Sequence, residues 1–293
     1  MRGIVLAGGR GTRLWPITRA INKQLIPIHD KPMIHYPIAT LMTAGIREIL
    51  IITNPKDIEH FKNLLGDGSD YGLSFEYAIQ NVPGGLAEAL ILGEEFVGDD
   101  SVALILGDNI FHGSGLGRRL EEFAKPNGAN IFAYHVSNPL QYGIVEFSEN
   151  GSVLSIEEKP QQPKSNWAIP GLYFFDNTSI ARAKACSRSL RGELEITEVL
   201  NSYLSDKSLH VSILPRGTAW LDTGTTADLN DAATYFRLLE DRQGTKVACL
   251  EEISWRLGLI NDAQLTKLAL SYEETPYAIY LHSLMRERSQ RDW

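Results

Sequence analysis

The sequence has few cysteines, no excess of basic residues and no long hydrophobic run. Its 293 residues include only Cys186 and Cys249, which lie far apart and lack C-x-x-C spacing or nearby histidines, so neither a disulfide framework nor a zinc site is expected. The formal net charge is −8, which lacks the basic excess that a general nucleic-acid-binding protein needs. No stretch approaches the roughly 20 apolar residues of a membrane span. We therefore expect a cytoplasmic protein with reduced thiols that binds neither nucleic acid nor membrane.

The first half of the chain alternates short β-branched runs with helical patterns. This alternation is typical of an α/β fold with a Rossmann-like, mostly parallel central sheet and helices on both faces. End signals define one helix opened by Pro32 and closed by Gly45, and another from an Asp57 N-cap to Gly66. The predicted strands span residues 4–7, 48–53, 74–79, 102–106 and 130–136.

Beyond residue 136 the predicted strands become shorter, at 143–147, 153–157 and 171–175. These strands predict a small β insert, and such inserts often carry substrate contacts. From Thr226 the apolar residues follow helical spacing until Gly244. A last helix is predicted to begin at Thr275-Pro276 and to end in the basic run from Arg286 to Arg291.

The strongest local signal is the run L-A-G-G-R-G-T-R-L, which follows the first strand. Gly8, Gly9 and Gly11 let the backbone approach a polyphosphate, and Arg13 adds positive charge. The loop is not a dinucleotide fingerprint, because Leu14 stands where the third glycine would be, and it lacks the Gly-Lys-Ser/Thr of a P-loop. The run predicts a phosphate-binding loop, with a simple glycine-rich turn as the alternative.

Further motifs follow in a fixed order. K-Q-L-I-P begins at Lys23 and K-P-M at Lys31, and with the glycine loop this order resembles the sugar nucleotidyltransferase family. A lone loop lysine is usually just solvated, but Lys23 follows the glycine loop closely enough to reach the same phosphates. The resemblance continues along nearly the whole chain, through residues 84–87, 106–109, 141–147, 157–160, 191–197 and 220–224.

Within that family the sequence is most similar to the members that act on dTTP and glucose 1-phosphate, because Y-G-I-V-E-F, K-S-N and G-L-Y-F stand in their usual places. The resemblance implies direct in-line displacement at the α-phosphorus, giving dTDP-glucose and pyrophosphate, with Mg²⁺ as cofactor and a homotetrameric assembly. It also implies a catalytic domain over 1–225, with a nucleotide part to about 136 and a sugar-binding insert after it, and a helical C-terminal segment over 226–293 packed on the core. The downstream pathway, towards rhamnose for a surface polysaccharide or another deoxysugar, stays open.

The resemblance also implies a nucleotide site. Gln80 can pair with the hydrogen-bonding edge of a pyrimidine, and the backbone of Gly85 lies where the family meets the base; a solvated surface glutamine is the alternative. The nucleotide-binding residues implied are Leu6, Gly8, Gly9, Gly11, Thr12, Arg13, Lys23, Gln24, Gln80 and Gly85.

A second set of residues matches the sugar-phosphate site of the family. The carboxylate of Glu158 can accept hydrogen bonds from sugar hydroxyls, and the ammonium of Lys159 can face the sugar phosphate. A surface ion pair is the alternative. The residues implied are Tyr142, Gly143, Glu158, Lys159, Ile169, Tyr173 and Arg191.

Asp108 and Asp222 match the metal ligands of the family, and with Arg13 and Lys23 they form the predicted catalytic set. Asp108 follows an apolar strand, and we expect both aspartates to follow segments that end at the carboxyl edge of the sheet, where open α/β sheets place ligands. An oxygen-only carboxylate pair suits Mg²⁺. The alternative for an isolated aspartate in a turn is an Asx cap.

The sequence departs from the family pattern at three positions. Glu88 stands where glutamine is usual, Gly84 where aspartate is common, and Pro170 where threonine normally precedes G-L-Y-F. These positions border the expected base and sugar pockets. The negative charge of Glu88 is expected to disfavour a nearby nucleotide phosphate, which affects the expected specificity but not the reaction type.

Three alternatives compete with this interpretation. The first is a nucleotidyltransferase for UTP, CTP or another hexose phosphate. The second is a catalytically silent regulatory subunit of the same fold, which the presence of Arg13, Lys23, Asp108 and Asp222 disfavours. The third is a nicotinamide-dependent oxidoreductase, which the broken fingerprint at Leu14 disfavours.

Overall fold

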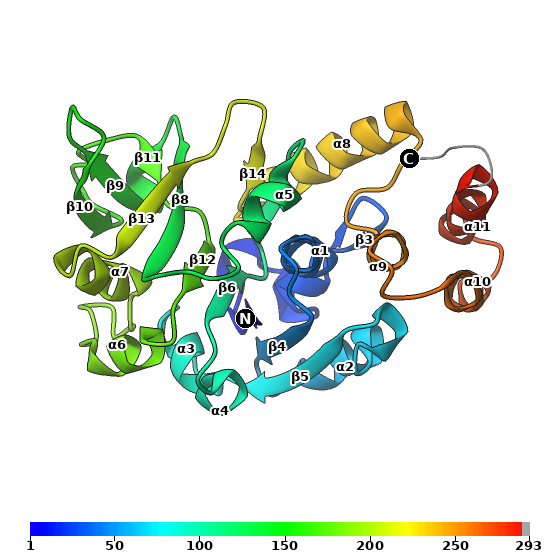
Figure 1. Cartoon of the computed structure of the whole chain (residues 1–293), viewed down its shortest axis with the longest axis horizontal. Coiled ribbons are helices and arrows are strands. Elements are labelled where there is room, and N and C mark those ends of the chain that lie inside the picture. The colour runs from blue at the N-terminus through cyan, green and yellow to red at the C-terminus, as the bar shows by residue number, and fades with distance from the viewer. Residues whose placement is uncertain (289–293) are drawn as a thin grey trace.

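The computed structural model of the chain describes residues 1–288 and is organised around one ten-stranded mixed sheet (Figure 1). The strand order is β10-β9-β11-β8-β12-β6-β1-β4-β5, and β13 pairs with β8. The strands are β1 (Arg2–Ala7), β4 (Glu48–Thr53), β5 (Ser74–Ile79), β6 (Val102–Leu106), β8 (Ala129–His135), β9 (Gly143–Phe147), β10 (Val153–Glu158), β11 (Trp167–Ala168), β12 (Leu172–Phe175) and β13 (Leu209–Ile213).

The N-terminal half of the sheet is parallel, as the alternating pattern predicted. β1 lies between β4 and β6 and pairs in parallel with both, and β5 extends the parallel set beyond β4. The later strands β9, β10, β11 and β12 pair in the antiparallel direction. The strands predicted for the insert thus extend the same sheet.

Helices cover both faces of the sheet. Successive strand residues point to opposite sides, so Val5 packs in one apolar cluster and its neighbour Ile4 in another. The first cluster includes residues of α1, α2, α5 and α8, and the second includes residues of α3, α4, α6 and α7. The helices are α1 (His35–Thr43), α2 (Ile58–Leu65), α3 (Glu88–Leu92), α4 (Glu94–Val97), α5 (Leu116–Glu121), α6 (Ser179–Ala185), α7 (Ile196–Ser205), α8 (Thr226–Gln243), α9 (Leu250–Arg256), α10 (Asp262–Ser271) and α11 (Pro276–Arg288).

The start predicted for the first helix was wrong. Pro32 belongs to a short hairpin of β2 (Pro27–Ile28) and β3 (Lys31–Pro32), and the helix begins only at His35. The hairpin pairing and the burial of Lys31 hold this segment extended, and these are tertiary contacts that a proline signal does not report. The helix predicted after Asp57 is α2, but the Asp57 carboxylate accepts hydrogen bonds from Asn22 and Asn54 and makes no cap bond.

The predicted helical C-terminal segment is present. α8 begins with a capping box in which Thr225 and Asp228 satisfy each other's backbone N–H groups, and it ends at Gly244 in the left-handed conformation. Its buried apolar side chains pack in the first apolar cluster against the sheet. α9, α10 and α11 enclose a separate small cluster. The predicted basic run reaches Arg286 in α11, and its part beyond residue 288 lies outside the described residues.

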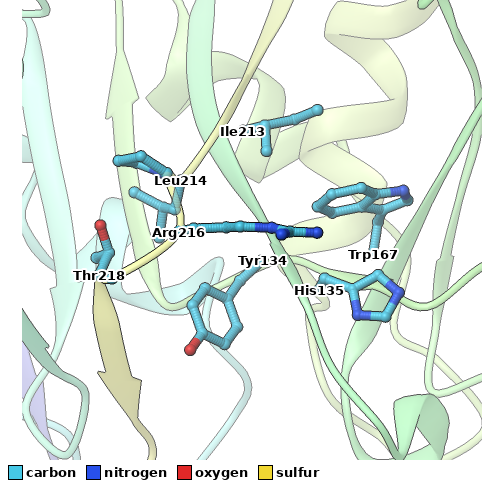
Figure 2. Close-up of a pocket in the computed structure, with 9 residues that line it drawn as sticks. Tyr134, His135, Trp167, Ile213, Leu214, Arg216 and Thr218 are labelled. Atoms are coloured by element: carbon cyan, nitrogen blue, oxygen red, sulfur yellow. The ribbon is translucent and has the colours of Figure 1, made fainter.

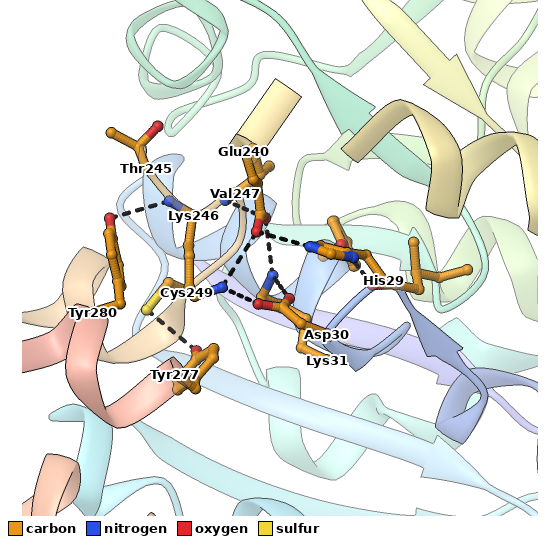
Figure 3. Close-up of polar contacts among 12 residues, drawn as sticks. His29, Asp30, Lys31, Glu240, Thr245, Lys246, Val247, Cys249, Tyr277 and Tyr280 are labelled. Carbon is orange, nitrogen blue, oxygen red and sulfur yellow. Dashed lines mark hydrogen bonds and ion pairs between the residues drawn. The ribbon is translucent and has the colours of Figure 1, made fainter. Parts of the chain in front are cut away.

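A group of charged residues, of which Lys31 and Glu240 are buried, joins the β2–β3 hairpin to the end of α8 (Figure 3). Glu240 of α8 accepts hydrogen bonds from the Lys31 ammonium at 3.1 Å and from the backbone N–H of Val247 at 2.8 Å. Asp30 is ion-paired with both Lys31 and Lys246. His29, Asp30 and Glu240 lie close enough together to hold a metal ion, but the two ammonium groups already neutralise these carboxylates. The group therefore ties the hairpin to the C-terminal segment.

Two further expectations concern thiols and membranes. Cys186 and Cys249 are both free thiols. Within residues 1–288, none of the helices combines the length and the apolar character that crossing a bilayer requires.

Candidate active site

The glycine loop leaves the sheet where β1 ends. The carbonyl of Ala7 accepts hydrogen bonds from Asn22 and Thr53, which fix the point of departure. Gly8 is buried, and a Cβ there would lie 2.6 Å from the side-chain oxygen of Gln80. Gly11 has φ 59°, which favours glycine. Gly9, Thr12 and Arg13 are exposed on the surface of the loop. At the end of β1, the carbonyl of Leu6 accepts a hydrogen bond from the N–H of Gly107.

Lys23 lies buried beside this loop and contacts the first predicted metal ligand. It begins a 3₁₀ turn that Asn22 caps by accepting the N–H of Gln24. Its ammonium donates to the Asp108 carboxylate at 2.6 Å. The side-chain carbonyl of Gln24 is buried without a partner among the described residues, so an acceptor remains for a ligand.

Asp222 is brought to Asp108 by a separate antiparallel ribbon. β7 (Ile110–His112) pairs with β14 (Ala219–Leu221), with Leu221 opposite Ile110, so the residue after β14 meets the turn before β7. The two aspartates lie close enough for the charge of Asp108 to act on Asp222, but the expected route for Asp222 was wrong. It follows this ribbon and not a strand of the central sheet, because within residues 1–288 Ala219–Leu221 pairs with β7 alone.

Two residues that the sequence interpretation missed hold Asp108 in place. Asn109 donates to the Asp108 carboxylate at 3.0 Å, while its own carbonyl accepts from the Gly171 N–H at 2.9 Å and from the Trp220 indole at 2.7 Å. The buried hydroxyl of Thr223 donates to the Asp108 carbonyl at 2.9 Å. Asn109 and Thr223 each directly follow a predicted metal ligand in the sequence. That position is the one sequence signal that could have identified them.

The site concentrates negative charge. The pKa of Asp222 is raised, mainly by burial and then by the charges of Asp228 and Asp108, while Lys23 acts in the opposite direction. Asp228 was not among the predicted residues. Arg13 approaches the same turn, because a Cβ on Gly224 would lie 3.1 Å from its guanidinium. A carboxylate pair flanked by two cationic side chains can bind a divalent cation and its phosphate ligands.

The predicted base-binding residues lie at one side of the glycine loop. Gln80 follows β5 and is 3% exposed, and its amide donates to the Glu88 carboxylate at 2.6 Å. Gly85 has φ 103°, and any Cβ there would overlap the backbone carbonyl of Leu194. Backbone hydrogen bonds between Leu194 and both Gly84 and Ala87 fix this segment against the loop before α7.

The predicted sugar-phosphate residues gather around Gly143. A Cβ on Gly143 would lie 3.4 Å from the Glu158 carboxylate and 3.8 Å from the side chain of Ile169. The Lys159 N–H donates to the carbonyl of Tyr142 at 3.1 Å, and the Lys159 ammonium lies 3.6 Å from Glu158. Burial raises the pKa of Glu158, and the charge of Lys159 partly offsets that effect.

Arg191 and Tyr173 complete this group; Arg191 is ion-paired and partly exposed, whereas Tyr173 is buried and neutral. Arg191 is already paired with carboxylates, at 2.9 Å from Glu195 and 3.4 Å from Glu158. Tyr173 is 3% exposed, and burial followed by the charge of Glu158 raises its pKa, so its hydroxyl is neutral. Arg191 can therefore reach a sugar phosphate only by giving up some of these contacts.

The geometry can be compared with known proteins. A family model described as nucleotidyl transferase matches residues 2–237, which span the sheet, both predicted substrate regions and most of α8. The chain belongs to the nucleotidyl transferase family.

Relatives of this nucleotidyl transferase match it over nearly its whole length. The glucose-1-phosphate thymidylyltransferase of Neisseria meningitidis serogroup A is 54% identical, over 98% of this chain and 100% of the relative. The protein of the same name from Mycobacterium tuberculosis is 55% identical, over 97% of this chain and 99% of the relative.

Solved structures agree with the fold of this nucleotidyl transferase. The crystal structure of a Bacillus anthracis protein named as a glucose-1-phosphate thymidylyltransferase, in complex with sucrose, superposes with a TM-score of 0.74. It is 38% identical and covers 80% of this chain and 94% of its own. A UDP-glucose pyrophosphorylase complexed with UDP-glucose is 24% identical, with a TM-score of 0.71 over 81% of this chain and 98% of its own, and it supports the fold alone.

Two cavities of this nucleotidyl transferase share Tyr134 in their lining. One of about 180 Å³ is lined by Asp222, Tyr142 and Asp228, so it belongs to the site described above. The other, of about 580 Å³, lies beyond Tyr134. Figure 2 shows Arg216 extending into it toward Trp167 and His135. None of the predicted site residues lines this second cavity.

Proposed function

We propose that this nucleotidyl transferase joins dTTP and glucose 1-phosphate to give dTDP-glucose and pyrophosphate. The observation that carries the proposal is the convergence of Lys23, Asp108 and Asp222 beside the glycine loop. The choice of substrates is supported by the near full-length similarity to proteins named glucose-1-phosphate thymidylyltransferase.

The proposed cofactor is Mg²⁺, held by Asp108 and Asp222. The donor set supports this choice, because it consists of carboxylate oxygens without histidine or cysteine, and Mg²⁺ favours one or two carboxylates together with phosphate and water. When bound, the ion would neutralise charge on the triphosphate and lessen its repulsion of the incoming sugar phosphate.

The side chains of the chain itself position and screen two anionic substrates. The loop amides from Gly8 to Gly11, with Arg13 and Lys23, would bind the triphosphate, and Lys159 would bind the sugar phosphate. An oxygen of the sugar phosphate then attacks the α-phosphorus, and pyrophosphate leaves in line. Since the attacking oxygen is already an anion, the step needs no general base, and catalysis depends on orientation and electrostatics.

Recognition of the two substrates is proposed to fall to separate groups. Gln80 and the backbone of Gly85 would meet the pyrimidine, and Glu158 would accept hydrogen bonds from sugar hydroxyls. We propose a homotetramer, which rests on the family resemblance alone, and a cytoplasmic location, which rests on the two unpaired cysteines and the lack of a long apolar run. We propose that the dTDP-glucose product is used in the synthesis of deoxysugars for polysaccharide.

The substrate assignment predicts a specific rate pattern. With Mg²⁺, the purified protein should release pyrophosphate from dTTP and glucose 1-phosphate fastest. UTP should be used less well, by about 1–3 kcal/mol in transition-state stabilisation, if its missing methyl and extra hydroxyl are read by packing. Purine nucleotides should be poor substrates. A coupled pyrophosphate assay over four nucleotides and several hexose phosphates measures this, and a preference for ATP or GTP would contradict the roles of Gln80 and Gly85.

The sugar-phosphate assignment predicts a selective effect on KM. Lys159→Ala should raise KM for glucose 1-phosphate much more than KM for dTTP, because it removes one cationic contact to one substrate. Lys164→Ala is the matched control, since Lys164 is an exposed lysine nearby that pairs with Glu157 at 2.7 Å. Equal changes in both KM values for Lys159→Ala, or none, would show that its ion pair with Glu158 is a surface contact.

A further inference from the structure

The amide of Gln80 is held in one orientation by a carboxylate. Gln80 donates through its side-chain nitrogen to Glu88 at 2.6 Å. A carboxylate only accepts hydrogen bonds, so the nitrogen of the amide must face Glu88, and the reversed amide would set its oxygen against a negative charge. The amide oxygen lies on the side of Gly8 and has no partner among the described residues. Its orientation is therefore fixed before any ligand binds.

Gly84 is what allows Glu88 to take this position. Any Cβ on Gly84 would overlap both oxygens of the Glu88 carboxylate. The carboxylate is the free end of a flexible side chain, so a larger residue at 84 would displace it from Gln80 without blocking the fold. Gly84 does not have a left-handed φ, so its backbone accepts other residues. Aspartate at 84 would also add a second negative charge. The two departures from the family pattern at 84 and 88 are thus structurally coupled.

The charge of Glu88 is balanced on its other side. Arg188 lies 3.7 Å from the Glu88 carboxylate and donates to the backbone carbonyls of Gly84 and Gly192. This contact lessens the repulsion expected between Glu88 and a nucleotide phosphate.

We propose that Glu88 and Gly84 together select thymine or uracil over cytosine by fixing the amide of Gln80. The inference rests on the proposed function, in which Gln80 meets the base. With one N–H bound to Glu88, the amide offers its oxygen and its second N–H in a fixed order. That order fits the N3–H donor and C4 carbonyl acceptor of thymine and uracil. Cytosine presents an acceptor and a donor in those places, so it requires the reversed amide, which Glu88 opposes. Glu88 is a positioning residue.

The test compares kcat/KM for dTTP, dUTP and dCTP, with glucose 1-phosphate and Mg²⁺, in the full-length protein. Glu88→Gln should lower the dTTP-to-dCTP ratio at least about tenfold, because an amide at 88 can accept or donate and so tolerates both orientations of Gln80. Gly84→Ala should lower the same ratio by displacing Glu88. The dTTP-to-dUTP ratio should not change in either variant, since these bases share the N3 and C4 groups. A generally loosened pocket would move both ratios.

Two controls separate the possible failures. Glu95→Gln removes an exposed carboxylate from the next helix and should leave both ratios unchanged. In the double variant Gly84→Asp/Glu88→Gln, the amide at 88 removes the charge repulsion that the new aspartate would have with Glu88. Its kcat/KM for dTTP should therefore exceed that of Gly84→Asp. The inference is wrong, and the proposed function stands, if the wild-type enzyme prefers dTTP but neither Glu88→Gln nor Gly84→Ala changes the dTTP-to-dCTP ratio. A wild-type enzyme that turns over other nucleotides but not dTTP would overturn the proposed function.

Discussion

Asp108→Asn and Asp222→Asn are each expected to lower kcat/KM for pyrophosphate release by roughly 10²–10³-fold, the loss typical of removing one preorganised electrostatic contact. Asp108 is oriented by Lys23 and Asn109, and Asp222 meets it through the β7–β14 ribbon. Without both carboxylates, the cation that screens the two anionic substrates would lose an anchor. The measurement is steady-state kinetics over a series of Mg²⁺ concentrations, and each variant should need more Mg²⁺ for half-maximal rate.

The double variant distinguishes a shared ion from two independent roles. If both residues act by holding the same ion, removing either one already removes most of the effect of that ion. The kcat/KM of Asp108→Asn/Asp222→Asn should therefore be little lower than that of either single variant. Losses that multiply would rule out a shared site.

The matched control is Asp231→Asn. Asp231 is an exposed carboxylate that lines the same 180 Å³ cavity as Asp222, but it is not among the carboxylates that raise the pKa of Asp222. This variant should keep its activity and its Mg²⁺ dependence. The Asp222→Asn protein should also stay folded, because the raised pKa of Asp222 means that its charged form is disfavoured in the fold. Loss of folding with normal activity in the folded fraction would identify a structural cap.

The sequence predicted the elements with strong local signals. The bounds of β4, β5 and β6 were predicted correctly, and β1 begins two residues before its predicted start. Strands covered on both faces, such as β4 and β6, are short apolar runs in the sequence. α8 was equally clear, since a periodic apolar face is bounded by Thr226 and Gly244. The glycine loop and the order of the motifs then pointed to Lys23, Asp108 and Asp222 before any geometry was known.

The remaining features depend on contacts between residues far apart in sequence. Pro32 carried a valid helix-start signal, but hairpin pairing and the burial of Lys31 overrode it. The route of Asp222 required knowing that Leu221 pairs with Ile110. The sequence showed that Glu88 and Gly84 were unusual, but their mutual contact and their link to Gln80 emerge only when α3 packs beside the end of β5.

Glu240→Ala is expected to destabilise the protein by roughly 3 kcal/mol, the lower end of the cost of breaking a buried ion pair, because it leaves the buried Lys31 ammonium to share the single carboxylate of Asp30 with Lys246. Lys31 is 3% exposed, and its ammonium bonds Glu240 at 3.1 Å. Glu240 also accepts the N–H of Val247, so alanine would leave that donor without its partner as well. Thermal unfolding should show Tm lowered on the order of 10 °C.

The origin of this loss can be tested with substitutions at the same positions. Asp241→Ala removes a carboxylate one residue away, whose pair with Arg237 is exposed at 3.3 Å, and should cost only about 0.3–0.5 kcal/mol. Glu240→Gln keeps an acceptor for Val247 but withdraws the charge facing Lys31, so it should remain clearly destabilised. Lys31→Met in the Glu240→Gln background removes the buried ammonium that would otherwise share Asp30 with Lys246, while Asp30 and Lys246 keep their own ion pair. If the buried charge is the cause, this double variant should be more stable than Glu240→Gln alone; if it is less stable, packing around the Lys31 stem holds the hairpin to α8.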